Sequence, residues 1–162
     1  MGNALSHINA QNRPGMVDVS DKAVTLRTAV AEAILRLPHQ VLKAIEGEDI
    51  ISPKGPVFHT AIIAGTQAVK RTHELIPFCH PLPVEGITIT IEPKDDVLVI
   101  RCRVSCTNKT GVEMEALTGA SVAALTIYDM CKSISHAMVI ERIRLMEKTG
   151  GKSDIHAGES YA

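Results

Sequence analysis

Cationic side chains gather in two segments of the sequence, and their types suit chemistry on a phosphorylated substrate. Lys54 stands between Pro53 and Gly55 just before a predicted helix, so its ammonium group is held in an exposed position. The segment KRTHELIPFCHP adds groups that bind phosphate or transfer protons, namely Lys70, Arg71, His73 and His80. A lysine whose pKa is lowered by burial near other cations would act as a general acid or base. The pattern favours acid/base work and argues against a hydrolase of the Ser-His-Asp type.

Acidic residues of a long predicted helix have structural alternatives that stay open beside a functional role. Thr110 followed by Glu113 fits a capping box, in which Glu113 satisfies backbone donors at the start of the helix. Asp129 and Lys132 are three residues apart, so they could form a surface ion pair worth roughly a few tenths of a kcal/mol.

Two motifs that suggest a metal site or a phosphate loop are weak. A metal site built from His73, Cys79 and His80 is disfavoured because adjacent Cys79 and His80 lack the usual ligand spacing. The string TGGKS at 149–153 resembles part of a Walker loop, but Met146 stands where that loop needs glycine. We therefore predict no metal site and no Walker site. The nearby Lys148 and Lys152 either bind phosphate or belong to a solvated tail.

The composition of the 162-residue chain disfavours nucleic-acid and membrane binding. Seventeen basic against eighteen acidic residues leave a net charge of -1, and there are only two Tyr, two Phe and no Trp. Such a chain has neither the overall field nor the stacking side chains that bind nucleic acid. The four cysteines are scattered without a CxxC pair, which is typical of packed thiols in a reducing compartment. No apolar run approaches the roughly 20 residues of a membrane span, so we expect a cytoplasmic protein.

The hydrophobic pattern predicts an α+β domain of ferredoxin-like βαββαβ type, with an antiparallel sheet, helices on one face and a short extra helix. The predicted elements are a strand at 25–37, a short helix at 38–46, a loop at 50–58, a helix at 57–74, strands at 86–92 and 97–106, a helix at 111–134 and a strand at 138–147. The alanine content of 25–37 would also suit a helix, but a strand completes the pattern. We divide the chain into a mobile arm at 1–15, a single catalytic domain at 16–154 and a flexible tail at 155–162.

The helix at 111–134 has two faces that differ in character. At 100° per residue, one arc of about 120° carries apolar and small side chains that must pack on the sheet: Ala116, Leu117, Ala120, Ala123, Ala124, Ile127, Cys131 and Ile134. The opposite face mixes apolar residues with single carboxylates: Glu115, Thr118, Val122, Leu125, Thr126 and Asp129. We infer a second buried contact there, with another subunit. Glu115 and Asp129 lie about 21 Å apart along the helix, so a shared site needs different elements or chains.

Four strings of this sequence closely resemble, in order, the molybdenum cofactor biosynthesis protein C family. They are MVDVSDK at 16–22, KGPVFHTAIIAGTQAVKRTHELIPFCHPLP at 54–83, KTGVEMEALTGASVAALTIYDMCKSI at 109–134 and KTGGKSD at 148–154. The resemblance implies a diphosphate-releasing lyase of molybdopterin synthesis. Its reaction would rearrange (8S)-3',8-cyclo-7,8-dihydroguanosine 5'-triphosphate to cyclic pyranopterin monophosphate.

The resemblance also assigns roles by motif position. Lys54 of KGPVF and Lys132 of YDMCK would be a catalytic pair of lysines, with Asp129 holding or tuning Lys132. His80 with Glu113 and Glu115 would line the pocket and hold the base or assist proton transfer. The other implied substrate-binding residues are Cys79, Met114 and the triphosphate candidates Arg27, Lys70, Arg71, His73, Lys148 and Lys152.

The same family resemblance implies a homohexamer, built as a trimer of dimers with its sites at the dimer interfaces. It implies no required cofactor, although Mg²⁺ could accompany the triphosphate. An alternative from another class is a ferredoxin-like regulatory module that senses a purine nucleotide without catalysis, because fold alone does not fix function.

Overall fold

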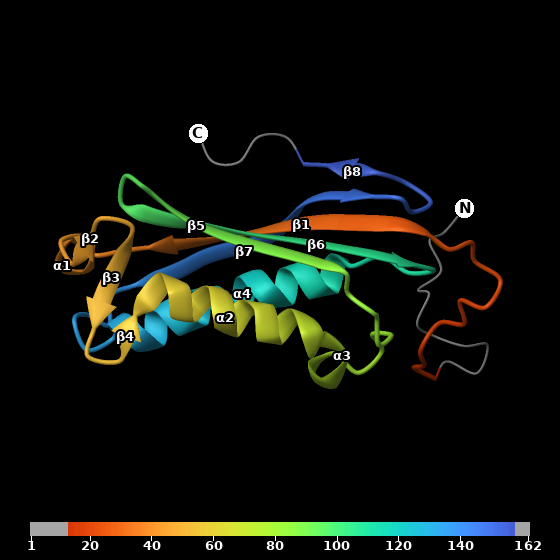
Figure 1. The fold of residues 1–162 in the computed structure, drawn as a ribbon, viewed down its shortest axis with the longest axis horizontal. Coiled ribbons are helices and arrows are strands. Elements are labelled where there is room, and N and C mark those ends of the chain that lie inside the picture. Colours follow the sequence, from red (N-terminus) through yellow and green to blue (C-terminus); the bar gives the residue numbers. More distant parts are fainter. Residues whose placement is uncertain (1–12, 158–162) are drawn as a thin grey trace.

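The computed structural model describes residues 13–157, which form an antiparallel sheet with helices on one face (Figure 1). In chain order the elements are β1 (Thr25–Arg36), α1 (His39–Leu42), β2 (Ile45–Glu46), β3 (Asp49–Ser52), β4 (Gly55–Pro56), α2 (Val57–Lys70), α3 (Thr72–Leu75), β5 (Gly86–Lys94), β6 (Val97–Asn108), α4 (Glu113–Cys131), β7 (Val139–Thr149) and β8 (Ile155–His156). The main sheet has the order β5-β6-β1-β7-β8, and α2 and α4 cover the same face of it.

The succession β1, α2, β5, β6, α4, β7 is the predicted βαββαβ unit, so the ferredoxin-like α+β prediction is confirmed. The doubtful first element is a strand, because β1 pairs along its length with β6 and also pairs with β7. Its alternate residues Ala29, Ala31, Ala33 and Leu35 are fully buried against the helices. Alanine is used here because small side chains let the helices approach the sheet closely.

The segment between β1 and α2 differs from the prediction. The short helix spans only His39–Leu42 instead of 38–46, and the predicted loop at 50–58 contains β3 and β4. Gly47 has a φ of 62°, which turns the chain back so that Ile45 pairs with Ile50. A left-handed turn of this kind favours glycine, so the chain forms a small three-stranded sheet, β2-β3-β4, in place of a longer helix.

Both long helices are shorter than predicted, whereas β5 and β6 extend two residues further. The first long helix ends at Lys70, because Arg71 leaves helical geometry with a φ of -111°, and α3 follows as a separate turn. The second long helix covers Glu113–Cys131. Ile155 and His156, within the predicted tail, pair with β7. Most of the predicted arm (residues 1–12) and the end of the predicted tail (158–162) lie outside the described residues, and the domain boundaries stay a prediction.

Helices α2 and α4 cross at two glycines. A Cβ atom at Gly65 would lie 2.9 Å from the carbonyl oxygen of Gly119, and one at Gly119 would lie 2.6 Å from Val69 and Cys102 side-chain atoms. The second buried contact predicted for α4 is therefore supplied in part by α2 of the same chain. The remainder of that face is open in the single chain, where Leu125 is 56% exposed.

Candidate functional site

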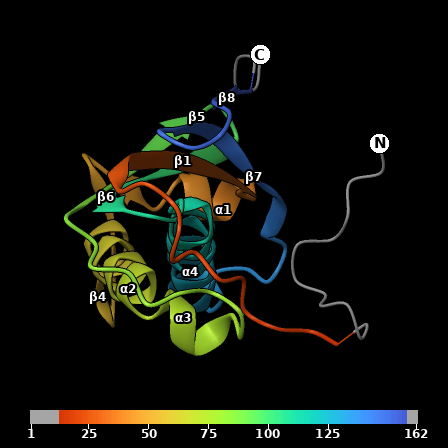
Figure 2. The ribbon, with the colours of Figure 1, turned by 90° about the vertical axis from the view of Figure 1, so that its right-hand side faces the viewer.

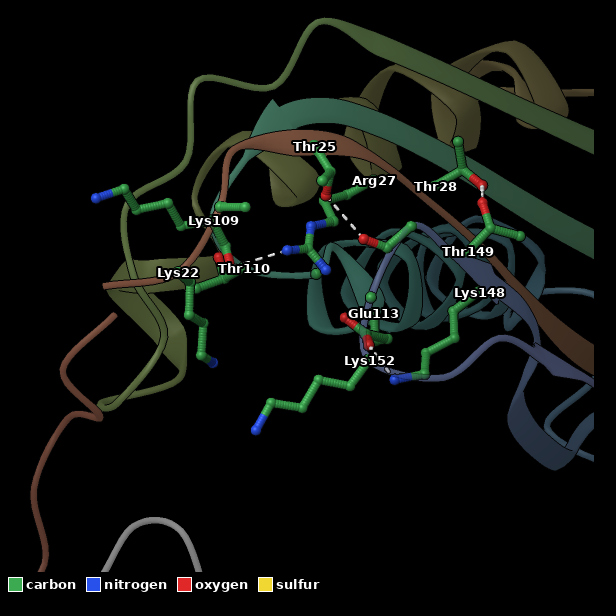
Figure 3. Close-up of a pocket in the computed structure, with 14 residues that line it drawn as sticks. Lys22, Thr25, Arg27, Thr28, Lys109, Thr110, Glu113, Lys148, Thr149 and Lys152 are labelled. Atoms are coloured by element: carbon green, nitrogen blue, oxygen red, sulfur yellow. Dashed lines mark hydrogen bonds and ion pairs between the residues drawn. The ribbon is translucent and has the colours of Figure 1, made fainter. Parts of the chain in front are cut away.

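A cationic cavity of about 550 Å³ opens where the start of β1, the loop before α4 and the end of β7 meet (Figure 3). Its charged lining consists of Lys22, Arg27, Lys109, Glu113, Lys148 and Lys152. Five of these six side chains are basic, so the cavity attracts an anion although the net charge of the chain is -1. Of the predicted triphosphate ligands, the cavity brings together Arg27, Lys148 and Lys152.

Local backbone geometry fixes the walls of this cavity. Gly150 has a φ of 82°, and a Cβ atom there would lie 1.9 Å from the carbonyl oxygen of Leu26, so only glycine fits. The Thr25 hydroxyl donates to the Gly150 carbonyl at 2.7 Å, and the Gly150 amide donates to Asp154 at 3.1 Å. The glycine turn after β7 is thereby held against β1, which places Lys152 at the cavity.

Hydrogen bonds and an ion pair orient the cationic side chains. The guanidinium of Arg27, a largely buried residue, donates to the carbonyls of Asn108 and Lys109 at 3.2 Å each. Lys148 Nζ lies 3.1 Å from Glu113 Oε1. The Lys109 ammonium donates to the carbonyl of Ser20 at 2.6 Å and points away from the cavity in Figure 3. Lys22, Arg27, Lys148 and Lys152 are therefore the better candidates for contact with an anion.

A second cavity of about 290 Å³ adjoins the first. The two share Lys22, Thr110, Gly111 and Glu113, and the second is further lined by Val17, Val19, Phe78, Cys79, His80, Leu82, Met114 and Glu115. The chain leading into β1 passes across this end of α4 in Figure 2, and His80 Nε2 lies 2.9 Å from the carbonyl oxygen of Val17. We call the lining of the two adjoining cavities the N-terminal half-site.

Glu115 is the buried carboxyl group of the N-terminal half-site. The residue is 4% exposed, and burial, with a smaller contribution from the charge of Glu113, raises its pKa to about 7. A carboxyl group with that pKa exchanges a proton near neutral pH, as a general acid or base must. Burial likewise raises the pKa of the Cys79 thiol, so this cysteine is protonated at neutral pH.

The two predicted catalytic lysines meet at one carboxylate. Lys54 Nζ lies 2.9 Å from Asp129 Oδ2, and Lys132 Nζ lies 2.6 Å from Asp129 Oδ1. Hydrogen bonds from Lys132 and Lys54 lower the pKa of Asp129 to about 2, and Asp129 raises the pKa of Lys132. That direction is opposite to the lowering that burial near other cations would produce, because the charge beside Lys132 is an anion and its side chain is about half exposed. We call these three residues the lysine cluster.

The lysine cluster and the N-terminal half-site lie at opposite ends of the molecule. Lys54 is in the turn between β3 and β4, at one end of Figure 1, and the chain entering β1 is at the other end. Glu115 and Asp129 stand fourteen positions apart on the same helix, which separates them by about 21 Å. One chain therefore contains both groups of predicted residues but does not bring them together.

The remaining predicted ligands lie outside both cavities. Lys70 ends α2, Arg71 joins the two helices, and His73 lies in α3, which contacts α4. All three residues are exposed, and none lines either cavity. Within the single chain, these three side chains therefore do not reach either cavity, and their contact with the triphosphate stays a prediction.

Within residues 13–157, no group of three or more His, Cys, Asp or Glu side chains is arranged to hold a metal ion. Of the helices in that part of the chain, none is long and apolar enough to cross a membrane.

A family model described as the MoaC family matches residues 16–151. The chain belongs to the MoaC family. A protein named cyclic pyranopterin monophosphate synthase from Xanthomonas axonopodis pv. citri (strain 306) is 56% identical over 156 residues, 96% of this chain and 94% of its own length. The protein of the same name from Xanthomonas oryzae pv. oryzae (strain MAFF 311018) is 55% identical over the same shares of both chains. The resemblance predicted from the motifs is confirmed.

One relative is about twice as long as this chain. The molybdenum cofactor biosynthesis bifunctional protein of Synechocystis sp. (strain ATCC 27184 / PCC 6803 / Kazusa) is 51% identical over 162 aligned positions, which cover 97% of this chain and 47% of the relative. The family domain therefore also occurs as about half of a larger protein.

The structure of this MoaC-family chain adds residues that the sequence analysis did not select. Lys22 and Lys109 line the cationic cavity. Lys22 ends the MVDVSDK string and Lys109 begins the KTGVEMEAL string, so their place in the family motifs was the available signal. Neither lies in a basic segment, and for that reason charge patterning alone did not reveal them.

Proposed function

We propose that this chain is a cyclic pyranopterin monophosphate synthase. It rearranges (8S)-3',8-cyclo-7,8-dihydroguanosine 5'-triphosphate to cyclic pyranopterin monophosphate and releases diphosphate. The observation that carries the proposal is the N-terminal half-site, in which a cationic cavity adjoins a pocket with a buried carboxyl group whose pKa is about 7. Relatives that are 55% and 56% identical and bear this name support it.

The cationic cavity binds the triphosphate in this proposal. Lys22 and Arg27 face one space from around the start of β1, and Lys148 and Lys152 face it from around the end of β7, so they contact a ligand with several phosphates from two sides (Figure 3). Cationic groups fixed in place stabilise the charge that develops when an alkoxide-like oxygen attacks phosphorus and diphosphate leaves. Lys70, Arg71 and His73 reach the substrate only where a neighbouring subunit extends the site.

The adjoining pocket holds the part of the substrate derived from guanine. Cys79, His80 and Met114 line it together with Glu113 and Glu115. Opening the purine-derived ring and closing it again as a pterin needs repeated proton transfers. Glu115 accepts or donates a proton at neutral pH, and His80 is placed in the same pocket to assist it.

The lysine cluster of a second subunit completes each site. Helix α4 carries the N-terminal half-site at its start and the lysine cluster at its end, so two α4 helices packed antiparallel bring opposite groups together. The part of the second α4 face that α2 leaves open, where Leu125 is 56% exposed, provides the surface for this contact. Lys54 and Lys132 then supply charge and protons to a substrate bound by the other subunit. The assembly is a dimer of this kind, repeated three times in a homohexamer.

The reaction needs no redox cofactor, because the rearrangement is redox-neutral overall. Mg²⁺ enters with the triphosphate, whose oxygens it prefers as ligands. We place the enzyme in the cytoplasm, and we expect it to bind neither nucleic acid nor membranes.

Turnover of the cyclised dihydro-GTP by the wild type, Lys54→Ala and Lys132→Ala variants tests the function. We expect the wild type to form cyclic pyranopterin monophosphate and diphosphate, and each variant to lose at least about a hundredfold in kcat. Product analysis by chromatography and mass spectrometry measures both products. Unchanged turnover in both variants contradicts the lysine assignments. Tight binding of a purine nucleotide by the wild type, without any turnover, supports the regulatory module instead.

A further inference from the structure

The position of Lys54 depends on a short hairpin between β2 and α2. Lys54 occupies the tip of the β3–β4 hairpin, which begins at Asp49 and runs directly into α2 at Val57. The two strands are paired only at Ile51 with Pro56 and Ser52 with Gly55. Two residue pairs do not fix a hairpin by themselves, because even longer isolated hairpins are marginal in water. Some other contact must hold its base.

Asp49 provides that contact. Its Oδ1 accepts hydrogen bonds from the amides of Ile50 at 2.7 Å and Phe58 at 2.6 Å. Its Oδ2 accepts one from the amide of His59 at 3.2 Å and lies 2.6 Å from His59 Nδ1. The carboxylate therefore joins the first residue of β3 to the first turn of α2, across the whole hairpin that carries Lys54.

This carboxylate also serves as the cap of α2. Pro56 stands at the N-cap position and makes no side-chain cap hydrogen bond, so the first amides of the helix need an acceptor from elsewhere. Asp49 is 7% exposed. Burial alone would raise its pKa, but the hydrogen bonds from Phe58, His59 and Ile50 outweigh burial and lower it. A buried, ionised carboxylate with these hydrogen bonds holds the start of β3 rigidly against the first turn of α2.

Ser52 continues the support toward the tip. Its hydroxyl donates to the Gly55 carbonyl at 3.0 Å and accepts from the Lys54 amide at 3.1 Å. Gly55 has a φ of 106°, which closes the turn. The backbone of Lys54 is thus linked through Ser52 and β3 to Asp49, and its ammonium is 2.9 Å from Asp129.

We propose that Asp49, assisted by His59, is a positioning residue that clamps the β3–β4 hairpin to α2 and so fixes Lys54 against Asp129. This inference rests on the proposed function for the catalytic role of Lys54. It assigns Asp49 no contact with substrate. The cationic cavity lies at the other end of the molecule, so the clamp affects the chemical step and leaves triphosphate binding intact.

The test compares Asp49→Asn with Glu48→Gln in the full chain. The control makes the same carboxylate-to-amide change on the adjacent, exposed residue. We expect Asp49→Asn to lower kcat by about tenfold or more with KM changed less than about twofold, since a displacement near 1 Å already has effects of this size. Acylation of lysines, followed by mass spectrometry, measures how reactive Lys54 is relative to Lys132. In Asp49→Asn this ratio should be several-fold higher than in the wild type. Glu48→Gln should match the wild type in both measurements.

Two outcomes overturn the clamp. One is an Asp49→Asn variant that matches Glu48→Gln in kcat and in the ratio of Lys54 to Lys132 acylation. The other is a loss of activity that appears in KM alone. If Asp49→Asn does not fold, His59→Ala takes its place, because it removes only the exposed imidazole. A ratio of Lys54 to Lys132 acylation in His59→Ala that equals the wild-type ratio also overturns the clamp. Absence of turnover in the wild type refutes the proposed function, whereas the acylation ratio still decides the clamp.

Discussion

At the scale of single residues, burial raises the pKa of Glu115 so far that its carboxyl group gains or loses a proton near neutral pH. Its pKa of about 7 in the folded chain lies above the ordinary value of 4.5. The folded state therefore binds more protons than the unfolded state between these two values. The stabilisation of the folded state by protonated Glu115 is fully present below about pH 4.5 and is lost as the pH rises through about 7.

We predict that Glu115→Gln removes this pH dependence. The free energy of unfolding of the wild type should fall between pH 5 and pH 8 by an amount of order 2 kcal/mol that the variant does not show. Urea titrations at several pH values measure it, and Glu46→Gln, at an exposed position, is the control. The pH profile of kcat should lose an apparent pKa near 7 in Glu115→Gln. An identical profile in the variant would remove Glu115 from the proton transfers.

Single residues of the site were predictable to the extent that a motif carried them. Lys54, Asp129 and Lys132, which the family resemblance grouped, lie together in one chain although Lys54 is 75 residues from Asp129, and their catalytic roles stay a prediction. The direction in which the pKa of Lys132 shifts was not predictable, since it depends on which charge lies nearest. The role of Asp49 was equally hidden, because an isolated aspartate in GEDII gives no sign that it caps a helix eight residues later.

At the scale of elements, the contact between α2 and α4 decides how close both helices lie to the sheet. Gly65 and Gly119 face each other, and a Cβ atom at Gly65 would also lie 2.6 Å from the Ile89 side chain. The backbone carbonyl of Gly119 cannot move aside without displacing α4. The two glycines therefore set the depth at which α4 holds Glu115 and Asp129.

We predict that Gly65→Ala destabilises the fold by about 1–3 kcal/mol, the usual cost of overpacking a close contact. Denaturant unfolding followed by circular dichroism measures the change. Gly15→Ala is the matched control, because a Cβ atom there would meet nothing within 4 Å. Equal free energies of unfolding for Gly65→Ala and Gly15→Ala would show that α2 and α4 can move apart without loss of stability.

Long elements were predictable and short ones were not. The hairpin of β5 and β6 follows from the alternation of apolar and polar residues over nine residues or more. The strand β1 does not alternate in this way, since five consecutive residues are buried, and it was predicted because a strand completes the βαββαβ pattern. Strands β2 and β4 have two residues each, which is too short for any periodic signal. Their formation depends on the turn at Gly47 and on the clamp at Asp49, which are contacts of the folded chain.

At the scale of the whole molecule, the near-neutral net charge conceals two groups of basic side chains at opposite ends of α4. Basic side chains gather at the cavity beside the start of the helix, and the lysine cluster lies at its end. The sequence predicted this separation because the rise per residue of a helix is fixed. It did not predict that α2 covers part of the second face of α4, since the order of residues contains no distance between separate helices.

Mixing of two inactive variants tests whether each site is shared between subunits. Lys54→Ala damages only the lysine cluster, and Arg27→Ala damages only the N-terminal half-site. In a mixed dimer one site combines the intact half of each chain and the other combines both damaged halves. Because half of randomly formed dimers are mixed, unfolding and refolding the variants together should restore about a quarter of the wild-type activity. Each variant refolded alone is the control, and mixtures as inactive as the controls would place each complete site within one chain.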